Sequence, residues 1–150
     1  MIQTKSYIRA FDDLMSTYDY YARQNGLQSK SLQMLLWLYH YPKRNEKNIT
    51  QQFLVRKTQS SKQVVNATIK SWSKKGFLEL IENPDDKRHK FIRLTPLGQS
   101  YAQKVILPLE QMEKASFQIL SNEEQNLLNK LTRKYTAALK QEMEKVYDSI

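Results

Sequence analysis

The feature that most constrains this chain is a short charged hairpin enclosed by a helix stop and a helix start. Gly76 is a typical residue just beyond a helix end, and two runs of strand character follow, 77–82 and 90–94. The residues between them, Asn83-Pro84-Asp85-Asp86-Lys87-Arg88-His89, are rich in turn formers. Thr95-Pro96 then matches an N-cap followed by a first-turn proline. Because a lone hairpin is marginally stable, we expect it to pack on neighbouring helices.

Apolar periodicity and capping residues predict four helices before this hairpin. The first has an apolar stripe and ends at Asn25-Gly26. Ser31 is expected to cap a second, deeply buried helix, and Pro42 to begin the next loop. Thr50 is expected to cap a short helix that ends near Arg56. The fourth helix runs to Lys75 and is capped by one of two serines, Ser60 or Ser61.

Two further helices are expected after the hairpin. One runs from Pro96 to about Phe117 and should bend or be interrupted at Pro108. The last begins at the capping box Ser121-Asn122-Glu123-Glu124 and is amphipathic. Two helices joined by a tight turn and followed by a basic hairpin describe a winged helix-turn-helix. The predicted fold class is therefore mainly α (α+β), with a two-stranded wing.

Positive charge is concentrated in the middle of the chain. The formal net charge is +9, and residues 43–93 hold 13 Lys and Arg against 5 Asp and Glu. The flanking segments 1–42 and 94–150 are nearly neutral. Such a concentration is typical of a surface that binds a polyanion. The amphipathic helices outside the basic segment need a partner for their apolar stripes, and a second copy of the chain would supply one.

Several function classes find no support in the composition. Without cysteine there is no disulfide, thiol nucleophile or redox sensor, and three scattered glycines form no phosphate-binding loop. His40 and His89 are too far apart in sequence to suggest a metal site, and Asp85-Asp86 fits a turn better than a catalytic pair. No apolar run approaches the roughly 20 residues that cross a bilayer. We expect a cytoplasmic protein with no enzymatic activity, metal, cofactor or membrane contact.

Three linked segments resemble the MarR family of transcriptional regulators. They are Lys75-Gly76-Phe77-Leu78-Glu79, then Asn83-Pro84-Asp85-Asp86-Lys87-Arg88, and finally Ile92-Arg93-Leu94-Thr95-Pro96-Leu97-Gly98. They supply a glycine after the recognition helix, a D-x-R wing and an L-T-x-x-G start to the next helix. One departure is Phe53-Leu54-Val55-Arg56, where the family usually has Leu-Ala and small residues.

The resemblance implies a homodimer bound to a pseudo-palindromic double-stranded DNA operator and acting as a transcriptional regulator, which we expect to be a repressor. Residues 1–150 would form one MarR-like domain, in which 31–95 make the DNA-binding lobe. The segments 1–25 and 96–150 would then be dimerisation helices. A basic module that binds RNA or an anionic surface without operator specificity is the alternative.

The implied DNA-contacting residues fall into three groups. In the recognition helix the base-reading candidates are Ser60, Ser61, Lys62, Gln63 and Asn66. Candidates for phosphate contact are Arg56, Lys57, Lys70, Lys74 and Lys75. The wing group is Asp86, Lys87, Arg88 and Lys90. Arg88 suits a narrow minor groove, whereas Asp86 would orient the wing by pairing with a cation, and His89 is expected to face solvent.

Each assignment has a plainer alternative. The serines serve equally as caps, Gln63 and Asn66 as idle surface amides, and Lys70 and Lys74 as a solvated helix face. Family members often bind a small aromatic or amphipathic effector. A pocket for one could be lined by Tyr18, Tyr21, Trp37, Tyr41 and Tyr101, although aromatics at helical spacing are more often core residues.

Overall fold

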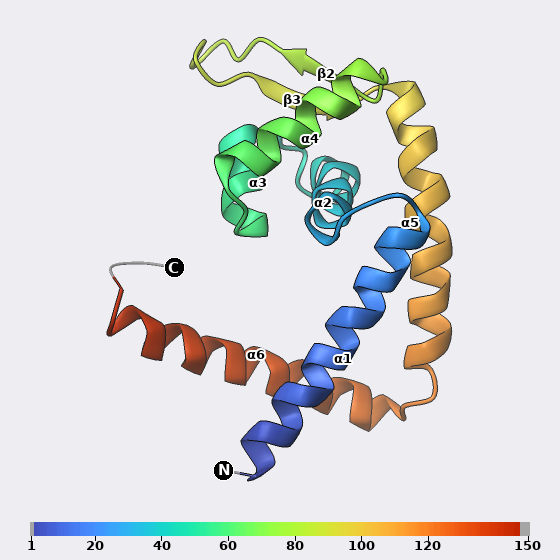
Figure 1. The fold of residues 1–150 in the computed structure, drawn as a ribbon, viewed down its shortest axis with the longest axis vertical. Coiled ribbons are helices and arrows are strands. Elements are labelled where there is room, and N and C mark those ends of the chain that lie inside the picture. The colour runs from blue at the N-terminus through green and yellow to red at the C-terminus, as the bar shows by residue number, and fades with distance from the viewer. Residues whose placement is uncertain (1, 148–150) are drawn as a thin grey trace. The chain divides into compact units, whose positions relative to one another are not determined.

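The computed structural model describes residues 2–147, which form six α-helices and one three-stranded sheet (Figure 1). The elements in chain order are α1 (Ile2–Gln24), α2 (Ser29–Asn45), β1 (Ile49–Thr50), α3 (Gln51–Thr58), α4 (Lys62–Lys74), β2 (Leu78–Ile81), β3 (Phe91–Leu94), α5 (Pro96–Phe117) and α6 (Asn122–Glu144). The chain divides into two compact units, with the boundary between Leu107 and Pro108 inside α5. The predicted mainly α fold with a wing is confirmed.

The sheet has the order β1-β3-β2 and is antiparallel throughout. In the hairpin, Leu78 is opposite Leu94 and Ile81 is opposite Phe91. On the other edge of β3, Ile49 of β1 is opposite Ile92. The prediction of a two-stranded wing missed β1, because a strand of two residues shows no alternation of apolar and polar positions.

The core of the first unit lies among α2, α3, α4 and the sheet. Its fully buried side chains include Met34 and Leu35 of α2, Leu54 of α3 and Val65 of α4. Leu54 is therefore the core residue of the atypical segment of α3. Its neighbour Phe53 instead packs at the half-exposed edge, with ring centroids 5.6 Å from Trp37 and 4.5 Å from Tyr41. We refer to Trp37, Tyr41 and Phe53 as the α2–α3 aromatic cluster.

Three predicted helix caps are confirmed. The hydroxyl of Thr50 accepts a hydrogen bond from the Phe53 amide at 3.2 Å, and that of Ser61 accepts one from the Val64 amide at 3.1 Å. Ser121 and Glu124 form the reciprocal capping box at the start of α6. Each of these side chains satisfies an amide that the first helical turn leaves without a backbone partner.

Other predicted helix boundaries were wrong. Helix α2 begins at Ser29 rather than after Ser31, and its N-cap residue Gln28 makes no side-chain capping bond. Pro42 lies inside the last turn of α2 instead of starting the loop. A proline there removes a single backbone hydrogen bond, and the helix ends later, where Glu46 adopts a left-handed φ of 53°. Helix α5 has the predicted bounds, Pro96–Phe117, without an interruption at Pro108, and a bend there stays a prediction.

A small junction joins the end of α4 to the sheet and to α5. The Thr95 amide donates to the Phe77 carbonyl at 3.0 Å, and the Thr95 hydroxyl donates to the Gly76 carbonyl at 2.5 Å. The same hydroxyl accepts from the Gly98 amide at 3.0 Å and so caps α5. A Cβ atom on Gly98 would lie 2.0 Å from the Phe77 carbonyl oxygen. Only glycine allows α5 to approach the backbone this closely.

We predict that Gly98→Ala destabilises the protein by about 1–3 kcal/mol, because the methyl group would push α5 away from β2. Urea denaturation followed by circular dichroism measures the change. Ser100→Ala, on an exposed position of the same helix, is the matched control and should change stability little. Equal unfolding midpoints for Gly98→Ala and the control would contradict the close approach.

Candidate nucleic-acid interface

Helix α4 buries one face and exposes the other. Val65, Ile69 and Trp72 are buried, whereas the predicted base-reading and phosphate-contacting side chains Lys62, Gln63, Lys70 and Lys74 are exposed and Asn66 is half-buried. Just after the C-terminal end of the helix, the Phe77 amide donates to the Trp72 carbonyl at 2.8 Å, and Gly76 has a φ of +81°. This left-handed glycine ends α4 and turns the chain into the wing.

The two serines before α4 have different roles. Ser61 is the N-cap, and its neighbour Ser60 accepts a hydrogen bond from the Thr58 hydroxyl at 2.8 Å. The Lys30 ammonium donates to the Thr58 carbonyl at 2.5 Å, at the end of α3. These contacts fix the turn between α3 and α4. Contact of Ser60 or Ser61 with a base stays a prediction.

Two predicted phosphate ligands lie beside the α2–α3 aromatic cluster. The Lys57 ammonium is 5.4 Å from the Trp37 ring centroid, and the Arg56 guanidinium is 5.6 Å from that of Phe53. Both side chains are exposed, so their charges remain open to a polyanion. Lys74 and Lys75 are exposed at the far end of α4.

The loop between β2 and β3 is organised by two side chains. Buried Asn83 accepts from the Asp85 amide through Oδ1 at 3.0 Å. Asp86 Oδ1 accepts from the Arg88 amide at 3.1 Å, and Arg88 Nε lies 3.4 Å from the same oxygen. The pKa of Asp86 is lowered, chiefly by its hydrogen bond with His89 and then by the Arg88 amide. The side chain of Arg88 is 86% exposed.

The His89 side chain is 36% exposed, and both of its ring nitrogens also have partners. Its Nδ1 lies 2.7 Å from Asp86 Oδ2, and its Nε2 lies 3.0 Å from the Gln52 amide nitrogen. Gln52 is 37 residues away in the sequence, on α3. No local pattern in the sequence signals such a contact, because it depends on how the wing folds back over α3.

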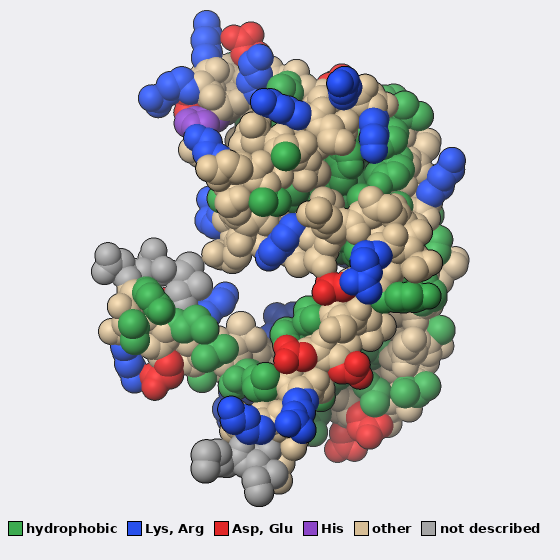
Figure 2. Space-filling view, in the orientation of Figure 1, with side chains coloured by type: hydrophobic (Ala, Val, Ile, Leu, Met, Phe, Trp, Pro, Cys, Tyr) green, Lys and Arg blue, Asp and Glu red, His purple; other side chains and the backbone are tan. Residues whose placement is uncertain are grey.

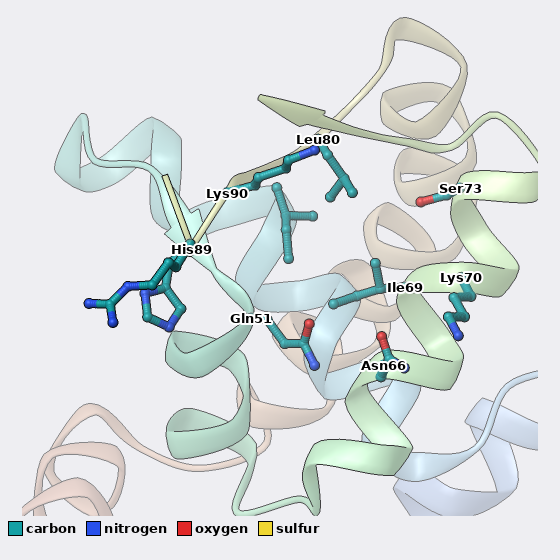
Figure 3. Close-up of a pocket in the computed structure, with 10 residues that line it drawn as sticks. Gln51, Asn66, Ile69, Lys70, Ser73, Leu80, His89 and Lys90 are labelled. Atoms are coloured by element: carbon teal, nitrogen blue, oxygen red, sulfur yellow. The ribbon is translucent and has the colours of Figure 1, made fainter. Parts of the chain in front are cut away.

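A cavity of about 410 Å³ lies between α4 and the wing, and we call it the α4–wing groove. Figure 3 shows Asn66, Ile69, Lys70 and Ser73 of α4 on one side and His89 and Lys90 of the wing on the other. Its apolar lining is Ile69, Leu80 and Ile92, and its cations are Lys70, Arg88 and Lys90. The Ser73 hydroxyl is buried there without a hydrogen-bond partner. Figure 2 shows Lys and Arg side chains gathered over the wing above it.

The five aromatic residues predicted to line one pocket are not brought together. Tyr21 donates through its hydroxyl to the Val105 carbonyl at 2.6 Å, and Tyr18 is half-buried on α1. Trp37 and Tyr41 belong to the α2–α3 aromatic cluster. Tyr101 stacks on Phe77 at a centroid distance of 4.4 Å, and burial raises the pKa of its hydroxyl. In this chain the five rings pack against different neighbours, which helical spacing alone did not show, and a single pocket lined by all of them stays a prediction.

A second cavity, of about 570 Å³, involves only Tyr101 of those five aromatics. Its other walls come from the turn between α1 and α2 and from the face of α4 that includes Val64 and Thr68. In the described part of the chain, no group of three or more His, Asp or Glu side chains could hold a metal ion. None of the helices in residues 2–147 is long and apolar enough to span a membrane.

The segment that forms this interface matches a known family. The sequence model of the MarR family aligns with residues 25–89. The resemblance to the MarR family is thereby confirmed over that segment. The matched segment contains α2, β1, α3, α4, β2 and the wing loop as far as His89. No curated protein sequence matches the chain.

Solved MarR-type structures extend the similarity of fold over most of the chain. NMB1585, a MarR family regulator from Neisseria meningitidis, has a TM-score of 0.78 at 19% identity, covering 97% of this chain and 99% of its own. S. aureus MepR in its DNA-binding conformation has a TM-score of 0.74 at 18% identity, covering 91% and 98%. NadR in complex with 4-hydroxyphenylacetate has a TM-score of 0.70 at 17% identity, covering 87% and 89%.

Ser61→Ala should destabilise the protein by about 1 kcal/mol, because the Val64 amide loses its capping partner. Ser61→Asp should restore stability, since aspartate is an equally good N-cap, yet it should weaken DNA binding by placing a carboxylate before α4. Thermal unfolding and a DNA titration separate the two effects. Wild-type DNA affinity in Ser61→Asp would show that this end of α4 lies away from DNA.

Proposed function

We propose that the protein is a sequence-specific transcriptional regulator that binds duplex DNA through α4 and the wing. The observation that carries the proposal is the exposed polar face of α4 beside a wing whose tip presents Arg88. An exposed α-helix of this kind fits the major groove of B-DNA, with its N-terminal residues near the base edges. The excess charge of residues 43–93 supports a polyanionic partner.

The proposed division of labour follows side-chain chemistry. Gln63 and Asn66 carry amides that can make paired hydrogen bonds to adenine, and Lys62 can bind guanine or a phosphate. Lys70, Lys74 and Lys75, together with Arg56 and Lys57, would neutralise phosphates and fix the register without reading sequence. Arg88, supported by Asp86, would enter the adjacent minor groove, with Lys87 and Lys90 beside it.

We further propose that the protein acts as a homodimer on a pseudo-palindromic operator. Each unit carries exposed apolar side chains on a terminal helix, which suits burial against a second copy. On α1 these are Tyr7, Ile8, Phe11, Leu14 and Met15, and on α6 they are Leu127, Leu128, Leu131, Tyr135, Leu139 and Met143. Two copies would present two recognition helices to successive half-sites. In this proposal residues 31–95 bind DNA and the flanking helices dimerise.

The last part of the proposal is that the protein represses transcription and that binding of a small-molecule effector releases it from DNA. NadR has been solved with 4-hydroxyphenylacetate, which is a small aromatic anion. In this chain the cavity beside Tyr101 borders α4 directly, so a ligand there could alter how α4 meets DNA. The regulator would work in the cytoplasm, on DNA, without catalysing a reaction.

The DNA for this test is a duplex that the wild-type protein enriches from a random-sequence pool. Arg88→Ala should lower the affinity for this duplex by about tenfold or more, because the wing loses its minor-groove cation. Fluorescence anisotropy at fixed salt measures the affinity. Arg133→Ala, an exposed charge on α6, is the matched control and should bind like the wild type. Unchanged affinity of Arg88→Ala would remove the wing from the interface.

The salt dependence of the same titration tests the partner itself. The slope of log K against log salt should be steep, at roughly −0.9 for each phosphate neutralised. Equal affinity for the enriched duplex and for random duplex would support the alternative, a basic module without operator specificity. A flat salt response would contradict a nucleic-acid partner altogether.

Leu131→Glu should convert the dimer into a monomer, because a buried carboxylate in the apolar interface would be left without a partner. Light scattering at micromolar concentration gives the mass. Asn129→Glu, two positions away on the same helix, is the control and should leave the mass of the dimer unchanged. A monomeric wild-type protein would contradict the symmetric operator.

A further inference from the structure

The imidazole of His89 joins the wing loop to the helix-turn-helix. Nδ1 is hydrogen-bonded to Asp86 within the loop, and Nε2 is 3.0 Å from the Gln52 amide nitrogen in the first turn of α3. The other side-chain hydrogen bonds described above for this loop, those of Asn83 and Asp86, close within the loop itself. His89 therefore adds a side-chain link between the wing loop and α3 to the backbone pairing of β3 with β1.

We infer that His89 is a positioning residue that docks the wing on α3 and thereby holds Arg88 in the position from which it would contact DNA. The inference rests on the proposed function, because it concerns how Arg88 is presented to DNA. Asp86 receives hydrogen bonds from both Arg88 and His89, so anchoring the imidazole also anchors the backbone that carries Arg88. A pre-organised wing loses less conformational entropy when DNA binds.

Glutamine at position 52 suits this bridge in either protonation state of the imidazole. When His89 is neutral, Nδ1–H donates to Asp86 and Nε2 accepts from the Gln52 amide group. When His89 is protonated, Nε2–H donates instead, and the Gln52 amide can turn over to offer its carbonyl oxygen. The bridge is thus kept while the charge on the wing changes.

Several charged side chains surround His89. On its own loop it is flanked by Asp86, Arg88 and Lys90, while α4 contributes Lys70 to the same groove. Helix α3 faces it with the neutral amides of Gln51 and Gln52. The bridge from His89 to Gln52 therefore fixes where the cations of the wing lie relative to those of α4, and losing it should weaken DNA binding.

A double-mutant cycle tests the bridge. His89→Ala, Gln52→Ala and the double variant are titrated at fixed pH and salt with the duplex enriched by the wild-type protein. Each single variant should weaken binding by about threefold to tenfold, and the double variant should bind no worse than the weaker single variant. Additive losses would mean that His89 acts as an independent cation and would overturn the positioning role.

Rescue by a conservative variant supplies a readout that misfolding would not give. His89→Gln keeps a polar side chain that can bond to Gln52, so it should bind DNA more tightly than His89→Ala. His40→Ala, which removes the chain's other histidine, is the control and should bind like the wild type. Equal affinities of His89→Gln and His89→Ala would overturn the inference, whereas absent or salt-independent DNA binding by the wild type would contradict the proposed function instead.

Discussion

The close approach of α5 to the Phe77 carbonyl, made possible by Gly98, is the constraint on which the interface depends. Thr95 bonds to both Gly76 and Phe77, so one residue ties the end of α4, the start of β2 and the start of α5 together. These bonds set the angle between the C-terminal end of α4 and the first strand of the wing. A recognition helix and a wing can contact neighbouring grooves of one duplex only if their spacing is fixed.

Charge and polar contacts are arranged around that frame. The cations of α4 and the wing line two sides of the α4–wing groove, and its apolar lining comes from Ile69, Leu80 and Ile92. Asp86 lies at the centre of the wing loop, and its lowered pKa keeps it ionised and able to hold both Arg88 and His89. The positive groove, the hydrogen-bonded wing loop and the exposed Arg88 at its tip together favour DNA as the partner over a loosely bound polyanion.

Local signals predicted much of this structure. Caps at Thr50, Ser61 and Ser121 mark helix starts because their hydroxyls satisfy nearby amides, and Gly76 marks the end of α4 for a similarly local reason. Non-local contacts escaped prediction. Strand β1 exists only because β3 lies beside it, His89 meets Gln52 only in three dimensions, and the five candidate pocket aromatics separate according to which neighbours pack on them.

The most direct test of the account is selection of duplexes from a random-sequence pool by the wild-type protein, followed by sequencing. A dimer that reads DNA with two α4 helices should enrich a pseudo-palindrome whose half-sites are centred about 10–10.5 base pairs, or a multiple of that, apart. Narrow A·T-rich minor grooves should flank the half-sites, where Arg88 would bind. Enrichment of an unpaired single site, or of no sequence at all, would contradict the central claim.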